Sequence, residues 1–252
     1  MTPRTITVVT AVHGPSMKYL PEAYASLDAQ VLPDGWAWQW LVQEDGVSGA
    51  ARDHLPEDAR ISLGTGRPLG QGIARTYALA RATGDYIKVL DSDDLLTPGA
   101  LARDIDVLER HPEVGWTTCS VLDLMPDGQK RGFDGNPPDG VMDRGAVHDY
   151  WLSHGYRASV HPATLCIRRT LLLALGGWMA LPAGEDTGLM LAADAVSNGY
   201  FIDRPGLLYR KWPGQVTADP AHTAAEEFAA RNAVIHERAA ALFAATPPIH
   251  MP

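Results

Sequence analysis

The sequence has 252 residues, 46% of them hydrophobic, which is enough to bury the core of one large domain. Its formal net charge of −9 argues against a nucleic-acid-binding protein, because that function needs a basic surface to neutralise phosphates. The two cysteines, Cys119 and Cys166, lack the spacing of a zinc site or a disulfide framework and are expected to be reduced.

Two features bear on location. The first hydrophobic run, Ile6–Val9, is too short for the core of a signal peptide and is typical of a buried strand. No stretch approaches the roughly 20 apolar residues that span a bilayer. We therefore expect a cytoplasmic protein without an integral membrane segment, and action at a membrane surface stays open.

The first half of the chain alternates short β-rich runs with helical patterns, as in parallel strands joined by crossover helices. Strands are expected at Ile6–Val12, Trp38–Gln43, Arg60–Leu63 and Tyr86–Leu90, and helices at Leu20–Ala29 and at Ile73–Thr83, the latter with Gly84 as its C-cap. This alternation predicts an α/β fold with a mostly parallel central sheet flanked by helices.

The second half continues less regularly. Thr97 and Pro98 are expected to open a helix that ends near His111. A strand at Val114–Asp123 is followed by a segment, up to Gly140, that is expected to be irregular. Further strands are expected at His161–Ile167 and Tyr200–Asp203. Helices are expected at Thr170–Leu175, at Thr187–Asn198 with Gly199 as its stop, and at Ala221–Ala245.

An acidic run, Asp91-Ser92-Asp93-Asp94, follows the expected strand that ends at Leu90. Ligands of open α/β sheets bind at such strand ends. Such a cluster of carboxylates costs stability unless a cation or hydrogen-bond donors compensate it, and oxygen ligands of this kind suit Mg²⁺ or Mn²⁺ bridging a diphosphate. The alternative is a solvated turn whose aspartates cap the next helix.

Several segments along the chain fit one known family and occur in that family's order. They are Tyr19 to Gln30, Leu41 to Ser48, Gly70 to Arg75, Ala82 to Asp94, His161-Pro162, Arg168-Arg169, Gly176-Gly177-Trp178, Gly184-Glu185-Asp186 and Tyr209 to Gln215. Over about residues 5 to 217 the chain resembles family 2 glycosyltransferases of the GT-A fold. It departs from them at Glu44, where Asp is usual, at Pro68 and Thr76, where Asn is usual, and at Trp212, where a metal-binding His is often found.

The resemblance implies one GT-A-type, Rossmann-like domain at 1–217, with a donor half at about 1–115 and an acceptor half at about 116–217. A C-terminal helical extension and tail would follow at 218–252. It also implies a hexosyltransferase-like enzyme that takes a nucleotide-sugar donor, with a UDP-sugar expected, and an acceptor that the sequence does not identify.

The resemblance further assigns site residues. Asp93, with Asp91, would hold Mn²⁺ or Mg²⁺, with ribose binding as the alternative role of Asp91. Asp45 would meet the nucleotide base. Arg75 would approach the pyrophosphate or support the acidic loop, with pairing to a neighbouring acid as the alternative. The expected donor-binding residues are Thr10, Ala11, His13, Asp45, Arg75, Asp91 and Ser92.

Sugar transfer with inversion needs a base that takes the proton of the acceptor hydroxyl. Glu185 and Asp186 open an expected helix and match the family's Glu-Asp motif, in which the Asp usually serves as base. We therefore expect Asp186, ahead of Glu185, to be catalytic. The alternative is that both acids compensate the positive end of the helix.

Two other functions stay open. A nucleotidyltransferase would also combine an α/β sheet with acidic metal ligands, but Val9–Gly14 does not supply the glycine-rich basic loop that it needs after the first strand. A degenerate nucleotide-sugar-binding protein is compatible with Glu44 and Trp212, although a binder has no need for a base. The sugar and the oligomeric state, a homodimer included, are not readable from the sequence.

Overall fold

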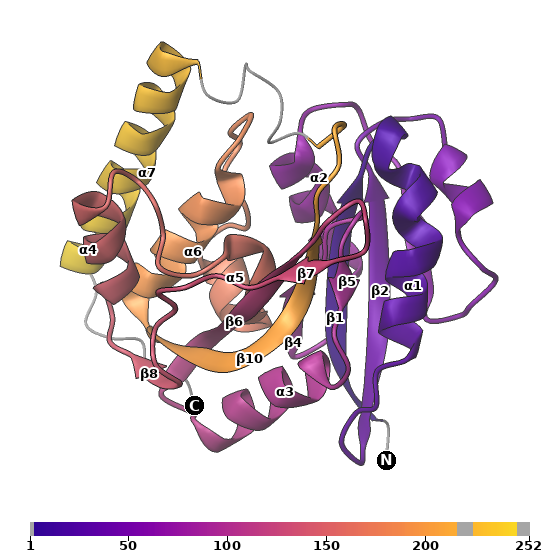
Figure 1. Cartoon of the computed structure of the whole chain (residues 1–252), viewed down its shortest axis with the longest axis horizontal. Helices are drawn as coiled ribbons and strands as arrows, with labels where there is room; N and C mark the ends of the chain where they lie inside the picture. Colours follow the sequence, from indigo (N-terminus) through magenta and orange to yellow (C-terminus); the bar gives the residue numbers. More distant parts are fainter. Residues whose placement is uncertain (1–2, 216–223, 246–252) are drawn as a thin grey trace.

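The computed structural model describes residues 3–215 and 224–245 (Figure 1). Within these ranges one ten-stranded sheet has the order β3-β2-β1-β4-β9-β6-β10-β5, with β7 paired to β6 and β8 to β10. The strands are β1 (Arg4–Val12), β2 (Trp36–Glu44), β3 (Ile61–Gly64), β4 (Tyr86–Val89), β5 (Leu95–Leu96), β6 (Val114–Leu124), β7 (Lys130–Arg131), β8 (Gly140–Met142), β9 (Cys166–Arg168) and β10 (Asn198–Arg210).

The sheet is parallel among its long strands. β3, β2, β1 and β4 run parallel to their neighbours, and so do β6 and β10. The short strand β9 lies antiparallel between β4 and β6 and joins the two parallel sets into one sheet. The predicted α/β fold with a mostly parallel central sheet is therefore confirmed.

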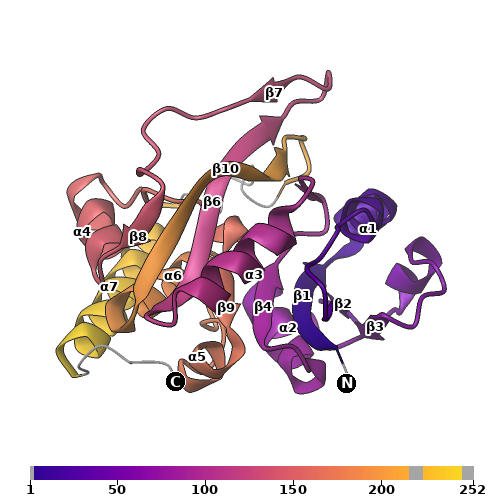
Figure 2. The ribbon, with the colours of Figure 1, turned by 90° about the horizontal axis from the view of Figure 1, so that it is seen from below.

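Helices cover both faces of the sheet (Figures 1 and 2). They are η1 (Gly14–Tyr19), α1 (Leu20–Asp28), η2 (Ala50–His54), α2 (Gln71–Ala78), η3 (Leu79–Arg81), α3 (Ala100–Arg110), α4 (Ala146–Ser153), η4 (Pro162–Thr164), α5 (Arg169–Ala174), α6 (Glu185–Val196) and α7 (Ala225–Ala245). Side chains alternate along β1, so Ile6 and Val8 pack with α1 and α3, whereas Val9 packs with α2, α5 and α6.

Helix α6 is the centre of the second layer. It is buried on nearly all sides because it lies between the sheet and the outer helices α4 and α7 (Figure 1). Ile235 and Ala239 of α7 are buried in the same core, so the predicted C-terminal helix is confirmed as a part of the packed structure. The expected boundary between 217 and 218 and the first residues of that helix, 221–223, lie outside the described residues.

Two glycines predicted as helix stops have other roles. Gly84 lies against β1, where a Cβ atom would meet Thr7 Oγ1 at 2.6 Å. Gly199 lies inside β10, where a Cβ atom would meet the ring of Trp116 at 2.4 Å. Both positions therefore need glycine for close approach rather than for capping. The helices that they were expected to close end earlier, with C-caps at Ala82 and Ser197.

Three other boundaries differ from the prediction. Helix α3 begins at Ala100, and Thr97 donates its hydroxyl to the carbonyl of Pro205 instead of capping the helix. The strand expected from His161 is the 3₁₀ turn η4 followed by the short strand β9, because Pro162 favours the first turn of a helix. The segment up to Gly140 contains β7. No helix of the described residues is both long and apolar enough to cross a membrane.

Candidate active site

A cavity of about 250 Å³ lies where β1 and β4 end. Because these strands run parallel, the residues that follow them meet at one edge of the sheet. The N-terminus of α6, the turn η4 and the segment after β10 complete its wall. The lining residues are Ala11, His13, Ser16, Gln71, Arg75, Asp91, Ser92, Asp93, His161, Pro162, Ala163, Pro182, Ala183, Gly184, Glu185, Asp186, Thr187, Tyr209, Trp212, Gly214 and Gln215.

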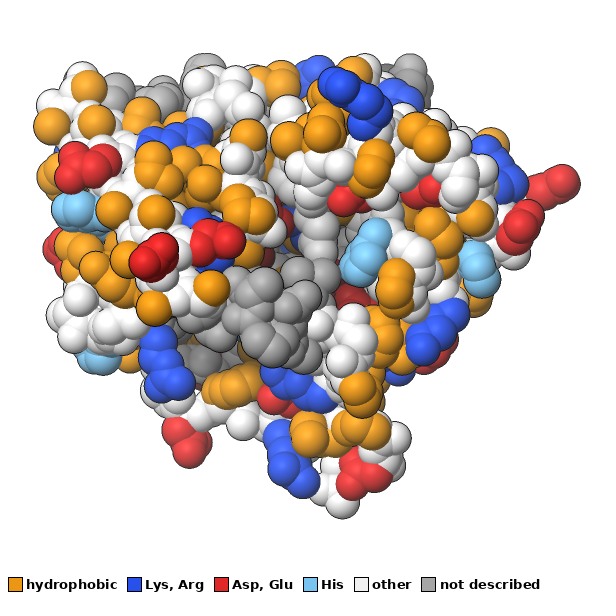
Figure 3. Space-filling view, turned by 90° about the horizontal axis from the view of Figure 1, so that it is seen from above, with side chains coloured by type: hydrophobic (Ala, Val, Ile, Leu, Met, Phe, Trp, Pro, Cys, Tyr) orange, Lys and Arg blue, Asp and Glu red, His pale blue; other side chains and the backbone are white. Residues whose placement is uncertain are grey.

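All the predicted site residues except Thr10 and Asp45 line this cavity. The acidic run after β4 and the Glu-Asp pair of α6 are about a hundred residues apart in the sequence, yet they share one wall. On the described part of the face seen in Figure 3, acidic, basic and hydrophobic side chains are interspersed.

Arg75 connects the two acidic motifs. Its side chain is 2% exposed, and its two terminal nitrogens donate to Asp91 Oδ1 at 2.6 Å and to Glu185 Oε1 at 2.8 Å. Gln71, one turn earlier on α2, also accepts from Arg75 at 3.0 Å. The guanidinium thus links the acidic run to the N-terminus of α6, which is the pairing with neighbouring acids expected as the alternative role of Arg75. Its approach to a pyrophosphate stays a prediction.

The acidic run is held from the opposite side by the segment after β10. Trp212 donates its indole N–H to Asp93 Oδ2 at 2.7 Å, and Arg210 donates to the carbonyl of Asp93 at 2.7 Å. The backbone N–H of Arg210 reaches the buried Asp94 at 2.8 Å. Trp212 therefore orients a carboxylate, and the guanidinium of Arg210 ties the loop to Glu22 of α1.

Glu185 and Asp186 differ in environment. Burial raises the pKa of Glu185 to about 7, and the charge of Asp186 adds to this, whereas Arg75 opposes it. Asp186 is less buried and accepts the backbone N–H of Thr187 at 2.7 Å through one oxygen. Thr187 thus occupies one carboxylate oxygen of Asp186, which leaves the other for a further contact, whereas Glu185 forms an ion pair with Arg75.

The charge of the lining is unbalanced. Four carboxylates (Asp91, Asp93, Glu185, Asp186) face one guanidinium. Burial and the charge of Asp91 raise the pKa of Asp93, and the hydrogen bond from Trp212 opposes this rise. Arg75 contacts one carboxylate oxygen of Asp91, and Trp212 contacts one of Asp93. The other oxygen of each carboxylate is a hard ligand of the kind that fits Mg²⁺ or Mn²⁺.

These two carboxylates do not form a complete metal cage. Within residues 3–215 and 224–245, no three His, Cys, Asp or Glu side chains form a group that would hold a metal ion. Mg²⁺ at phosphate sites commonly uses one or two carboxylates together with substrate phosphates and water. The residues present therefore fit a metal whose other ligands come from a bound diphosphate.

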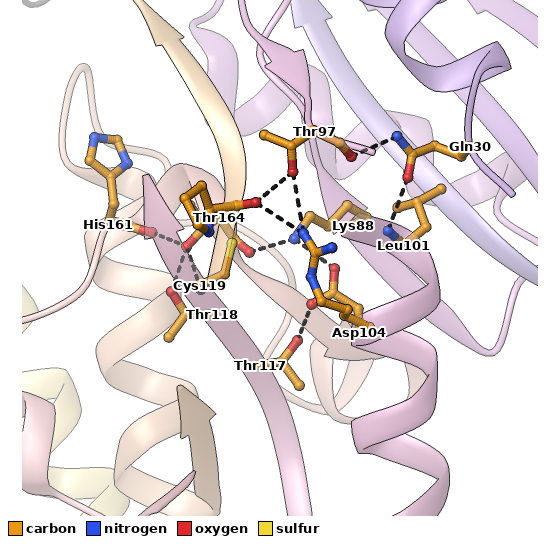
Figure 4. Close-up of polar contacts among 12 residues, drawn as sticks. Gln30, Lys88, Thr97, Leu101, Asp104, Thr117, Thr118, Cys119, His161 and Thr164 are labelled. Carbon is orange, nitrogen blue, oxygen red and sulfur yellow. Dashed lines mark hydrogen bonds and ion pairs between the residues drawn. The ribbon is translucent and has the colours of Figure 1, made fainter. Parts of the chain in front are cut away.

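His161 is a wall residue to which the sequence analysis gave no role. Burial lowers the pKa of its ring, which packs against Tyr209 at 4.7 Å between centroids. Its carbonyl accepts from Thr164 Oγ1 at 2.7 Å, and the carbonyl of Thr164 accepts from Lys88 at 2.7 Å (Figure 4). In the sequence, His161-Pro162 indicated only a match to the family and the start of a turn at the proline. The position of the His161 ring at the cavity becomes visible only in the fold.

Thr10 and Asp45 lie outside the described lining. The hydroxyl of Thr10 is fully buried, donates to the carbonyl of Leu90 at 2.7 Å and accepts from Trp40. Its side chain therefore joins β1 to the end of β4. Asp45 accepts the backbone N–H groups of Leu69 and Gly70 at 2.8 and 3.1 Å, which orders the loop that enters α2.

Contact of Asp45 with a base stays a prediction. The N–H of Gly70 contacts both carboxylate oxygens, so Asp45 makes three contacts, and a carboxylate with about four acceptor positions keeps one for a base. Asp45→Ala is expected to weaken UDP more than GDP, since an uracil N–H would lose its acceptor. Calorimetric titration of both nucleotides measures the difference. An equal loss for both would show that Asp45 acts only through the loop.

An acidic cavity thus lies at the ends of parallel strands, on a sheet covered by helices on both faces, as the resemblance to the GT-A fold implies. Residues 7–135, about half of the chain, match the model of the family described as glycosyl transferase family 2. The chain belongs to this family, which decides against the nucleotidyltransferase alternative.

Curated relatives match part of the chain. The O-antigen biosynthesis protein RfbC of Myxococcus xanthus is 30% identical over 115 residues, which are 43% of this chain and 9% of that protein. The uncharacterized glycosyltransferase MJ1057 of Methanocaldococcus jannaschii is 27% identical over 115 residues, which are 43% of this chain and 39% of that protein. The aligned part of this chain thus spans well under half the length of either relative.

Solved structures agree with the fold. TarS 1-349 of S. aureus in complex with UDP-GlcNAc has a TM-score of 0.69 at 16% identity, covering 95% of this chain and 70% of that one. The same protein in complex with UDP has a TM-score of 0.62 at 18% identity, covering 83% of this chain and 61% of that one.

Proposed function

We propose that this protein is an inverting glycosyltransferase that moves a sugar from a UDP-sugar to an acceptor hydroxyl, assisted by Mg²⁺ or Mn²⁺, with Asp186 as general base. The observation that supports it is the junction made by Arg75, which contacts both Asp91 and Glu185. Two clusters therefore share one cavity: Asp91 and Asp93, which suit a metal and a diphosphate, and Glu185 and Asp186, which suit proton removal.

The chain's own residues divide the reaction between them. The acceptor oxygen bonds to the anomeric carbon, the bond from that carbon to the diphosphate breaks, and the diphosphate leaves with the electron pair. Asp186 takes the proton of the acceptor hydroxyl on the face opposite the leaving group. Glu185, held by Arg75, keeps the N-terminus of α6 in place while this occurs.

Asp91 and Asp93 would hold the metal, which when bound supplies Lewis-acid stabilisation of the charge on the departing diphosphate. Trp212 keeps Asp93 oriented for this task. A uridine donor is supported by the fold shared with TarS, whose structures contain UDP and UDP-GlcNAc.

Asp93→Ala is expected to weaken the Mn²⁺-dependent part of UDP-sugar binding by at least about 10- to 100-fold, because loss of even an indirect metal contact has that effect. The fold should persist, since Asp93 lies on the wall of the cavity. Isothermal calorimetry with and without Mn²⁺ measures both components of the affinity.

Asp53→Ala, which removes an exposed carboxylate outside the cavity, is the matched control and should bind as the wild type does. If donor binding by Asp93→Ala depends on Mn²⁺ as much as binding by the wild type does, Asp93 is not a ligand of the metal. Donor binding without any hydrolysis or transfer by the wild type would favour the degenerate binding protein.

A further inference from the structure

A second cavity of about 650 Å³ adjoins the first and shares His161, Pro162 and Thr187 with it. Thr187 follows Asp186 and donates its backbone N–H to that carboxylate at 2.7 Å. The second cavity therefore adjoins the part of the wall that carries the proposed base. We call this cavity the lateral groove. Its lining residues lie between Cys119 and Phe201, within the half of the chain expected to serve the acceptor.

Aromatic rings form much of the lateral groove. Phe133, Tyr150 and Tyr156 line it and are 47%, 36% and 44% exposed, whereas Phe201 is buried. The ring of Tyr150 stacks on His154 with 3.7 Å between centroids and 4° between planes. Exposed rings in a concave surface suit the CH faces of sugar rings.

Tyr156 has an unusual backbone. Its φ of 67° is the one positive φ of a non-glycine among the described residues, and its ring packs on Trp151 at 4.7 Å. Bulky side chains rarely adopt this conformation, and such residues concentrate at binding sites. The surrounding structure thus holds the ring of Tyr156 at the groove against a local backbone preference.

The charges of the lateral groove are balanced, in contrast to those of the first cavity. Asp134 and Arg157 are its oppositely charged residues, and Asn136 and Ser159 add neutral hydrogen-bonding groups. Balanced charges of this kind do not attract a polyanion. The lining combines ring faces with donors and acceptors, which is the combination that recognises an uncharged polyol ring.

We propose that the lateral groove binds the acceptor, and that this acceptor is an uncharged saccharide whose ring stacks on Tyr156 and whose hydroxyl is presented to Asp186. This inference rests on the proposed glycosyltransferase function, because it names the substrate that the second cavity delivers to that reaction. The size of the groove fits a ligand larger than a single small alcohol.

The test offers the wild type a UDP-sugar with Mn²⁺ and three kinds of acceptor: uncharged oligosaccharides of one to four units, a polyol phosphate polymer and an unglycosylated peptide. Transfer to an oligosaccharide is expected. Tyr156→Gly, which removes the ring and suits the positive φ, should raise the KM for that acceptor about tenfold, equivalent to about 1.4 kcal/mol, with kcat nearly unchanged. Tyr156→Phe keeps the ring face and should restore the KM.

Phe243→Ala removes an equally exposed ring on α7, outside the groove, and should leave the KM for the acceptor unchanged. An unaltered KM in Tyr156→Gly, or transfer only to the polyol phosphate or the peptide, would overturn the inference. Hydrolysis of the UDP-sugar by the wild type in water is measured separately. If hydrolysis occurs without saccharide transfer, the inference alone fails, whereas absence of both donor binding and hydrolysis overturns the proposed function as well.

Discussion

Asp186→Asn is expected to retain the donor complex while lowering transfer by about 10² to 10⁴, the usual contribution of a positioned general base. The amide has nearly the shape of the carboxylate, and its oxygen can still accept the N–H of Thr187, but it cannot take a proton. The loss of a favourable charge at the N-terminus of α6 is worth about 1 kcal/mol or less. A loss of two to four powers of ten in rate therefore reports the chemistry.

The measurement is single-turnover transfer at saturating donor and acceptor, with donor affinity determined separately by calorimetry. Asp149→Asn makes the same chemical change in the first turn of α4, outside the cavity, and should transfer at the wild-type rate. Near wild-type transfer in Asp186→Asn, together with collapse in Glu185→Gln, would move the base to Glu185. If neither variant slows transfer, Glu185 and Asp186 only compensate the positive charge at the N-terminus of α6.

The second large effect concerns a buried ion pair behind the site. Lys88 of β4 and Asp104 of α3 are each 1% exposed, and Lys88 Nζ lies 2.8 Å from Asp104 Oδ2 (Figure 4). Thr117 donates to Asp104 at 2.6 Å, and Lys88 also holds the carbonyl of Thr164. Burial alone would lower the pKa of Lys88, but the charge of Asp104 raises it above its usual value.

Lys88→Met should lower the free energy of unfolding by about 3–5 kcal/mol, because it leaves the carboxylate of Asp104 buried without its partner. Urea denaturation at pH 7 measures this loss. The double variant Lys88→Met, Asp104→Leu removes both charges and should recover most of the stability, since apolar pairs of similar volume often replace buried ion pairs without loss. A double variant no more stable than Lys88→Met would show that packing, not the unpaired charge, causes the loss.

The sequence predicted the sheet and the acidic motifs because both depend on local patterns. β-rich runs gave β1, β2 and β4 within one or two residues. Asp91 and Asp93 were singled out by their place after a strand, whereas Glu185 and Asp186 were assigned through their match to the family's Glu-Asp motif. Their convergence in one cavity followed from the resemblance to a family whose fold is known. Gly84 and Gly199 were misassigned because a glycine required for close packing and a glycine that caps a helix cannot be distinguished in the sequence.

Pairings between distant elements were not predictable from local patterns. The contact of Arg75 with Glu185 depends on how α2 packs beside the N-terminus of α6, and periodicity carries no such information. The donation by Trp212 to Asp93 was missed for the same reason. The lateral groove is built mainly from the segments around Phe133 and Tyr156, which have no repeating pattern that would indicate which surface they form.

The guanidinium of Arg75 has a thermodynamic consequence for the two motifs that it joins. Asp91 and Glu185 share one buried cation, so neither carboxylate has an electrostatic environment independent of the other. Neutralising Asp91 leaves the whole cation to Glu185, and neutralising Glu185 leaves it to Asp91. Free-energy changes at residues in one such network do not add. The acidic run after β4 and the Glu-Asp pair of α6 are therefore a single energetic unit, and substitutions tolerated in one depend on the residues retained in the other.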